Sequence, residues 1–210
     1  MKELDLLKKD WQKSAASFQQ ISETEIYRMI HKKSSSIVKW ILIISILEIS
    51  FWTFSNLFIN TDDVLHKMNH PEIVTALEFL TYFNYIVVLI FVYIFYKNYK
   101  TISTTIATKS LMSAILKTRK TVQYYVWYNL GMIVITAILS FFIAFVYNPD
   151  MEFLRNKLAM NGKAMFVTIG ILFLVILGFF GLFWCFYRVI YGTLLRRLYA
   201  NYKELKKIDF

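Results

Sequence analysis

Four long apolar runs dominate the pattern of hydrophobic and polar positions along the chain. A hydrocarbon core of about 30 Å is crossed by roughly 20 helical residues, and each run reaches that length. Strands of an outer-membrane barrel would instead read as alternating segments of about ten residues. Because a helix satisfies its own backbone groups in lipid, the pattern predicts an all-α, polytopic membrane protein. The predicted transmembrane helices cover residues 37–59, 76–96, 124–147 and 165–187.

Lysine and arginine are divided unevenly among the polar segments that flank these runs. Of 24 such residues, 20 lie in or beside segments 1–36, 97–123 and 188–210. The other four lie in segments 60–75 and 148–164. Positive residues collect on the cytoplasmic side of membrane proteins, so both termini are expected in the cytoplasm of a bacterium, with the protein in its inner membrane. Segments 60–75 and 148–164 are then outer loops.

Composition supports a membrane protein and changes the meaning of the net charge. Hydrophobic residues make up 57% of the 210 residues and charged residues 18%, against roughly 25% charged residues in soluble domains. The net charge is +10. Because the basic residues border the apolar runs, anionic headgroups of the inner leaflet are the expected partner, and no nucleic acid is expected. The single cysteine, Cys185, allows no intrachain disulfide.

Amphipathic cytoplasmic helices are expected at both ends of the chain. Leu4, Leu7, Trp11 and Phe18 form a heptad-like stripe in segment 1–36. Two interpretations stay open for this stripe: a helix that lies on the inner leaflet, or a docking helix for a cytosolic protein or a second copy of the chain.

The serines that follow this region and the residues after the fourth run carry further predictions. The run Ser34-Ser35-Ser36 is interpreted as a short polar joint before the first span. Apolar residues in the tail recur at spacings of three and four, from Tyr191 to Leu205. This spacing predicts that the fourth helix continues into the tail and packs on the basic segment 97–123 or on the N-terminal helix.

Glu48 is the residue with the sharpest candidate chemistry, because it lies near the middle of the first apolar run. A charged carboxylate at mid-membrane costs at least about 2.5 kcal/mol, so Glu48 should face the bundle interior. Removal from water favours the protonated, neutral acid. Two interpretations follow: interhelical hydrogen bonding, or a proton or cation site. The expected polar partners at similar depth are Asn84, Thr136, Ser140 and Thr168.

Aromatic residues at the ends of the apolar runs are interpreted as interfacial anchors. Amphipathic rings prefer the headgroup level of a bilayer. The residues assigned to the inner boundary are Trp40, Tyr124, Tyr125, Trp127, Trp184 and Tyr187.

The first outer loop contains a weak candidate for metal binding. Asp62, His66 and His70 are spaced so that they would share one face of a helix, and two such histidines can bind zinc. The segment is short, however, and Pro71 is expected to end any helix there. A solvated loop is therefore the preferred interpretation, and no metal or other cofactor is expected.

Small residues in the third and fourth runs predict close helix packing. Ser140 and Ala144 form a small-xxx-small pair, and Gly170, Gly178 and Gly181 lie along the fourth run. Such residues let helix backbones approach closely in lipid. Contact between the third and fourth spans is the preferred interpretation, and a homo-oligomer face is the alternative.

The N-terminal region resembles that of a known group of proteins. The stretches Leu4-Asp5-Leu6-Leu7-Lys8-Lys9-Asp10-Trp11 and Glu25-Ile26-Tyr27-Arg28-Met29-Ile30-His31, followed by Val38-Lys39-Trp40, resemble small uncharacterised integral membrane proteins of Bacteroidota, chiefly flavobacteria. The resemblance covers about the first 40 residues and the four-span layout. Some members carry a carotene-cleaving oxygenase label, which implies a β-propeller with four iron-binding histidines. Three histidines and four apolar helices do not support that label here.

Two functions remain after these observations. Some members of the group lie beside sigma-factor genes, which implies a role in envelope signalling. Catalytic signatures such as HExxH, GxSxG and a phosphate loop are absent from the sequence, so an enzyme is not expected. The leading prediction is a non-catalytic inner-membrane protein that docks or regulates a cytosolic or membrane partner. The alternative is a small transporter or ion-handling protein that uses Glu48.

Overall fold

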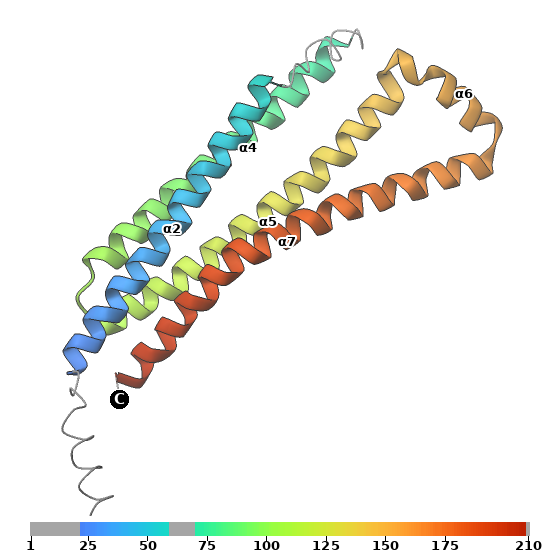
Figure 1. Ribbon diagram of the computed structural model, residues 1–210. Helices are drawn as coiled ribbons and strands as arrows, with labels where there is room; N and C mark the ends of the chain where they lie inside the picture. The colour runs from blue at the N-terminus through green and yellow to red at the C-terminus, as the bar shows by residue number, and fades with distance from the viewer. Residues whose placement is uncertain (1–21, 59–69, 209–210) are drawn as a thin grey trace, which may run out of the picture.

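The computed structural model describes residues 22–58 and 70–208, and these residues form helices and no strand. Figure 1 shows a long bundle with one short helix across one end. The all-α prediction is confirmed. The elements are α2 (Glu23–Phe58), α4 (Pro71–Thr104), α5 (Thr108–Tyr147), a 3₁₀ turn (Pro149–Met151), α6 (Glu152–Met160) and α7 (Gly162–Ile208).

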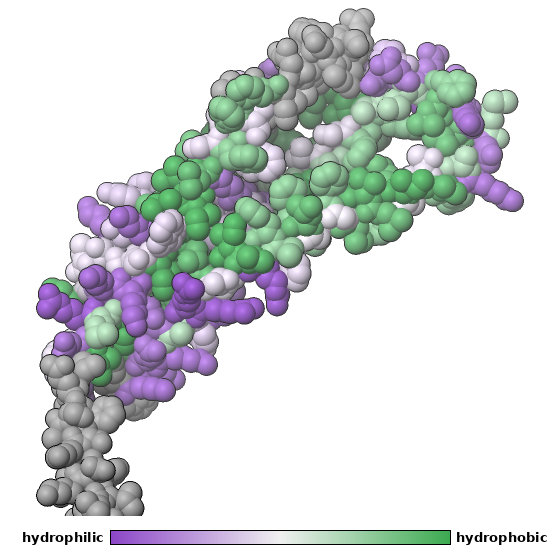
Figure 2. Space-filling view, viewed as in Figure 1, coloured by the Kyte–Doolittle hydropathy of each residue, from purple (hydrophilic) through white to green (hydrophobic). Residues whose placement is uncertain are grey.

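Four of these helices, α2, α4, α5 and α7, are long and apolar enough to cross a membrane. The chain is therefore a multi-pass membrane protein. Each long helix extends beyond its apolar run, because polar residues at its end continue the same helix. The beginning of α2 and the end of α7 lie at one end of the bundle, where hydrophilic side chains gather, and α6 lies at the other (Figures 1 and 2). We call these the basic end and the α6 end.

The helices extend at the basic end around a second apolar core. The basic segment 97–123 consists of the end of α4, a connection at residues 105–107 and the beginning of α5. The prediction that the fourth helix continues into the tail is confirmed, because α7 runs to Ile208. Its tail packs with α2, α4 and α5 in a cluster of Ile30, Val38, Ile102, Leu111, Ile115, Leu198 and Leu205.

One predicted boundary is wrong. The serine run at 34–36 is no joint, because α2 passes through it without a break. Ser34 is fully buried and accepts a hydrogen bond from the Asn201 side-chain amide at 3.0 Å, so its hydroxyl serves helix packing. Pro71 begins α4. The first position of a helix needs no backbone N–H donor, and proline's fixed φ suits it.

The four long helices form a ring that opens at the α6 end. In this ring α2 packs on α4 and α7, and α5 also packs on α4 and α7. Towards the α6 end, α7 diverges from α5, and the short α6 joins the two (Figure 1). The most apolar window of α7 buries none of its residues in the chain.

The predicted contact between the third and fourth spans is confirmed, because α5 packs on α7, but the glycines do not make it. A side chain built at Gly170, Gly178 or Gly181 would meet nothing within 4 Å. The glycines therefore do not bring α5 and α7 together. The two helices instead meet nearer the basic end through tyrosines, including Tyr125 and Tyr191, whose ring centroids are 5.8 Å apart.

Candidate functional site

Glu48 lies inside the helix ring, where three tyrosines donate hydrogen bonds to its carboxylate. The Tyr125 hydroxyl on α5 donates to Oε2 at 2.8 Å. From α7, the Tyr191 hydroxyl donates to Oε2 at 3.3 Å, and the Tyr187 hydroxyl donates to Oε1. One carboxylate thus connects α2 to both α5 and α7. The prediction that Glu48 faces the bundle and takes part in interhelical hydrogen bonds agrees with this geometry.

A compact aromatic layer surrounds these tyrosines. The rings of Phe91 and Phe95, both on α4, meet the Tyr125 ring edge-on with centroids 5.4 Å apart in each case. Tyr187 stacks on Tyr191 with ring centroids 5.9 Å apart. Tyr125 and Phe95 are fully buried. The layer therefore fills the bundle at the level of Glu48 and closes it towards the basic end.

A cavity of about 400 Å³ begins at this layer and is lined by all four long helices. Four of the five polar residues singled out within the spans, Glu48, Asn84, Thr136 and Ser140, line it. Thr168 is not among the lining residues, and its hydroxyl donates to the Ala164 carbonyl in its own helix at 3.0 Å. The remaining lining residues are Ile49, Trp52, Leu77, Leu80, Thr81, Tyr85, Val88, Tyr125, Asn129, Met132, Ile133, Ala137, Phe183 and Tyr187.

The cavity extends from Glu48 towards the α6 end. On α5 its lining residues run from Tyr125 to Ser140, which at 1.5 Å per residue spans about 22 Å. Among the described residues that line it, Glu48 is the only carboxylate, and no lysine, arginine or histidine takes part. A single carboxyl group therefore lies at the floor of a mostly apolar cavity.

The direct partners of Glu48 differ from those expected. Asn84 accepts a hydrogen bond from the Tyr128 hydroxyl at 3.1 Å and makes none with Glu48. The sequence pattern predicts Tyr125 and Tyr187 at the headgroup level and Glu48 at mid-membrane. Their hydrogen bonds to Glu48 instead put all three residues at one level of the bundle. Tyr187 and Tyr191 are one helical turn apart and so share a face of α7, which is the sequence signal for this pair.

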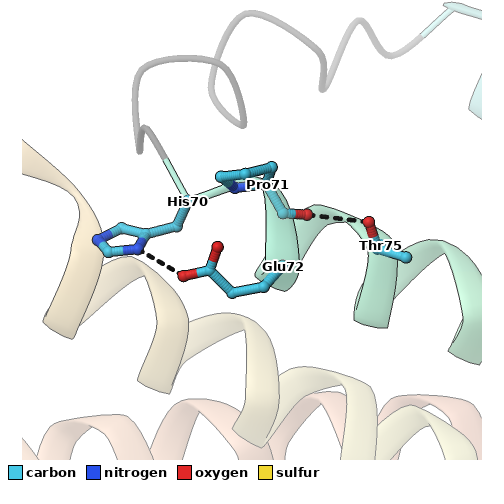
Figure 3. A network of polar contacts seen from close by, with 4 residues as sticks. All are labelled: His70, Pro71, Glu72 and Thr75. Carbon is cyan, nitrogen blue, oxygen red and sulfur yellow. Dashed lines mark hydrogen bonds and ion pairs between the residues drawn. The ribbon is translucent and has the colours of Figure 1, made fainter.

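A second polar group lies at the α6 end, where α4 begins (Figure 3). His70 Nδ1 lies 2.9 Å from Glu72 Oε1, and this hydrogen bond holds the pKa of the exposed Glu72 carboxyl below its usual range. The His70 ring also meets the Tyr147 ring edge-on, with centroids 4.7 Å apart. These contacts join the beginning of α4 to the end of α5.

The metal and docking predictions fall largely on residues that the structure does not describe. Asp62 and His66 lie outside the described residues, and His70 is engaged by Glu72. Within residues 22–58 and 70–208, no group of three histidine, cysteine, aspartate or glutamate residues could hold a metal ion. The stripe of Leu4, Leu7, Trp11 and Phe18 also lies outside the described residues.

Comparison with known proteins places the chain in a family. A family model described as a domain of unknown function, DUF8845, matches residues 24–210. The chain belongs to the DUF8845 family. The match includes all four long helices, and thus the cavity and the three tyrosines around Glu48. No curated protein and no solved structure matches the chain.

Proposed function

We propose that this DUF8845 member is a small, non-catalytic membrane carrier that binds a cationic solute in its four-helix cavity, with Glu48 as the binding group. The observation that carries the proposal is a single carboxylate, held by three tyrosines, at the floor of a cavity of about 400 Å³. Intramembrane carboxylates in protein-lined cavities commonly mark ion or substrate pathways.

The hydrogen bonds around Glu48 leave room for a cation. A carboxylate offers about four acceptor positions, two on each oxygen. Oε2 accepts from Tyr125 and Tyr191, whereas Oε1 accepts from Tyr187. One position on Oε1 is therefore open for a ligand, and the neighbouring phenol rings can add cation–π attraction. The tyrosines hold the carboxylate in place and prepare it for the cation.

Proton exchange fits the same site. We propose that Glu48 holds a proton when the cavity is empty, because an uncompensated carboxylate in a low-dielectric cavity is costly. Arrival of a cation compensates the negative charge, so the proton leaves Glu48 as the cation binds. Each binding event then exchanges one proton for one monovalent cation.

Equilibrium binding tests the proposed function. Protein in lipid nanodiscs is titrated calorimetrically with a panel of tetramethylammonium, tetraethylammonium and tetraphenylphosphonium. At least one cation should bind the wild type, and Glu48→Gln should weaken that binding at least tenfold, which corresponds to about 1.4 kcal/mol. Glutamine keeps the size of the side chain but cannot carry the negative charge.

Glu78→Gln is the matched control for this titration. Glu78 is exposed on α4 and does not line the cavity, so its substitution should leave the affinity unchanged. If no cation in the panel binds the wild type, the proposed function is wrong. Equal binding by wild type and Glu48→Gln would also contradict it.

The proposed orientation puts the basic end in the cytoplasm of a bacterium and the cavity towards the outside, in the inner membrane. The gathering of lysine and arginine at the ends of the long helices supports it. A reporter that is active only outside the cytoplasm should be silent when fused after Phe210 and active within α6, near Lys157. Activity after Phe210 would reverse the orientation and direct the cavity to the cytoplasm.

Docking of a partner stays as the second candidate function. The helices extend as a packed bundle around the second apolar core at the basic end, and Figure 2 shows hydrophilic side chains gathered there. This surface would suit an acidic cytosolic protein or anionic headgroups of the inner leaflet. A docking role for the stripe of residues 4–18 stays a prediction. An envelope signalling role, which the resemblance to the Bacteroidota group implies, also stays a prediction.

A further inference from the structure

We infer that the cation is lipophilic and reaches Glu48 sideways from the lipid, through an opening between α2 and α5 where α7 diverges. This inference rests on the proposed function and specifies its substrate class. Three features of the described residues support it: the chemistry of the cavity wall, the part of that wall that α7 leaves unlined, and the closure of the side facing the basic end.

The cavity wall favours a ligand that is mostly apolar. Its polar side chains above the floor are neutral amides and hydroxyls, whereas its apolar members include Trp52, Leu80, Met132 and Phe183. A compact hydrated ion would lose its hydration shell on entering the cavity, and Glu48 would be its one charged partner there. An organic cation with apolar substituents loses little hydration and gains contact with these walls.

One side of the cavity has no wall among the described residues. On α5 the lining continues to Ser140, and on α4 to Leu77, but α7 contributes only Phe183 and Tyr187 next to the floor. The described lining residues of α2 end at Trp52. The rings of Trp52 and Phe183 are in contact, with centroids 6.1 Å apart. Beyond this contact, the described residues leave the cavity open between α2 and α5.

The surroundings of this opening are apolar. On the diverging part of α7, Phe173 is 63% exposed and Leu174 is 67% exposed. Side chains of this kind face lipid tails in a membrane-spanning segment, so a ligand that arrives through the opening comes from the bilayer.

The side of the cavity that faces the basic end is closed, because the aromatic layer around Tyr125 and Phe95 fills the bundle there. Beyond the cavity, the His70 and Tyr147 rings join α4 to α5. These contacts leave the side bordered by α7 unfilled by the described helices.

Comparison of two cations tests the substrate class. Tetraphenylphosphonium and tetramethylammonium carry the same charge but differ in apolar surface. The wild type in nanodiscs should bind tetraphenylphosphonium at least tenfold more tightly, after subtraction of its partition into empty nanodiscs. The preference should disappear in Glu48→Gln, because a ligand held by lipid alone would not depend on the carboxylate.

The outcomes separate this inference from the proposed function. Tighter or equal binding of tetramethylammonium that depends on Glu48 would overturn the lipophilic substrate and leave the proposed function intact. Absence of binding by either cation and by tetraethylammonium would contradict both. Tetraphenylphosphonium binding that is unchanged in Glu48→Gln would be partition into lipid, and would also contradict both.

Fluorescence quenching tests the lateral route separately. The signal of Trp52 is obtained as the difference between wild type and Trp52→Phe in bilayers of brominated phosphatidylcholine. Brominated tails should quench this signal at least twofold relative to ordinary lipid, and saturating tetraphenylphosphonium should reduce that quenching. A Trp52 signal that brominated lipid does not quench, or that the cation leaves equally quenched, would overturn the lateral route.

Discussion

Substitution of Tyr125 by alanine is expected to lower the free energy of unfolding by about 3–5 kcal/mol, the range for removal of a large aromatic side chain from a core. Tyr125 is fully buried, and its ring contacts Phe91, Phe95 and Tyr191. Its hydroxyl also holds Glu48. Alanine leaves a void where α4, α5 and α7 meet, and lipid cannot fill it.

Tyr124 provides the matched control for this measurement. It is the neighbouring tyrosine on α5 but is 67% exposed, so Tyr124→Ala should change the free energy of unfolding by no more than about 0.5 kcal/mol. Unfolding is followed in bicelles by titration with dodecyl sulfate. Equal losses for the two variants would show that the aromatic layer does not support the bundle.

Substitution of Glu48 by leucine is expected to cost about 2–4 kcal/mol. Interhelical hydrogen bonds in a membrane contribute about 0.6 kcal/mol on average and about 1.7 kcal/mol at most, and Glu48 accepts three of them. Leucine is close in volume but accepts none, so three phenol groups lose their acceptor inside the bundle.

Glutamine at the same position separates stability from function. Glu48→Gln keeps one carbonyl oxygen as an acceptor, so its stability loss should stay at about 1 kcal/mol or less. Dodecyl sulfate titration of the two variants measures the difference. A leucine variant as stable as the wild type would mean that the tyrosines do not depend on Glu48, and the hydrogen-bonded floor of the cavity would lose its support.

The architecture could be predicted from the sequence because backbone groups in lipid must be satisfied within the chain. Each apolar run therefore had to be a helix, and all four runs are. The same reasoning directed Glu48 inwards, and Asn84, Thr136 and Ser140 line the same cavity. Those predictions needed only the depth and polarity of single residues within single helices.

The partners of Glu48 could not be predicted in this way, because they depend on how far each helix is shifted along its neighbours. Tyr125 and Tyr187 lie at the ends of apolar runs, where a ring is ordinarily an interfacial anchor. Because polar residues continue the helices beyond the runs, these tyrosines lie well inside the bundle, level with Glu48. Likewise, the glycines in the sequence do not indicate that α7 diverges from α5, which leaves them without a neighbouring helix in contact.

Ethidium flux tests the central claim most directly, namely that Glu48 and not the N-terminal stripe carries the function. Liposomes loaded with DNA report ethidium influx by fluorescence, with wild type, Glu48→Gln and a chain without residues 1–21 compared at equal protein content. The shortened chain keeps the whole region that matches the family. We predict that it matches the wild-type rate, and that Glu48→Gln falls to the rate of protein-free liposomes. Wild-type flux in Glu48→Gln, or loss of flux on removal of residues 1–21 alone, would contradict the account and favour docking.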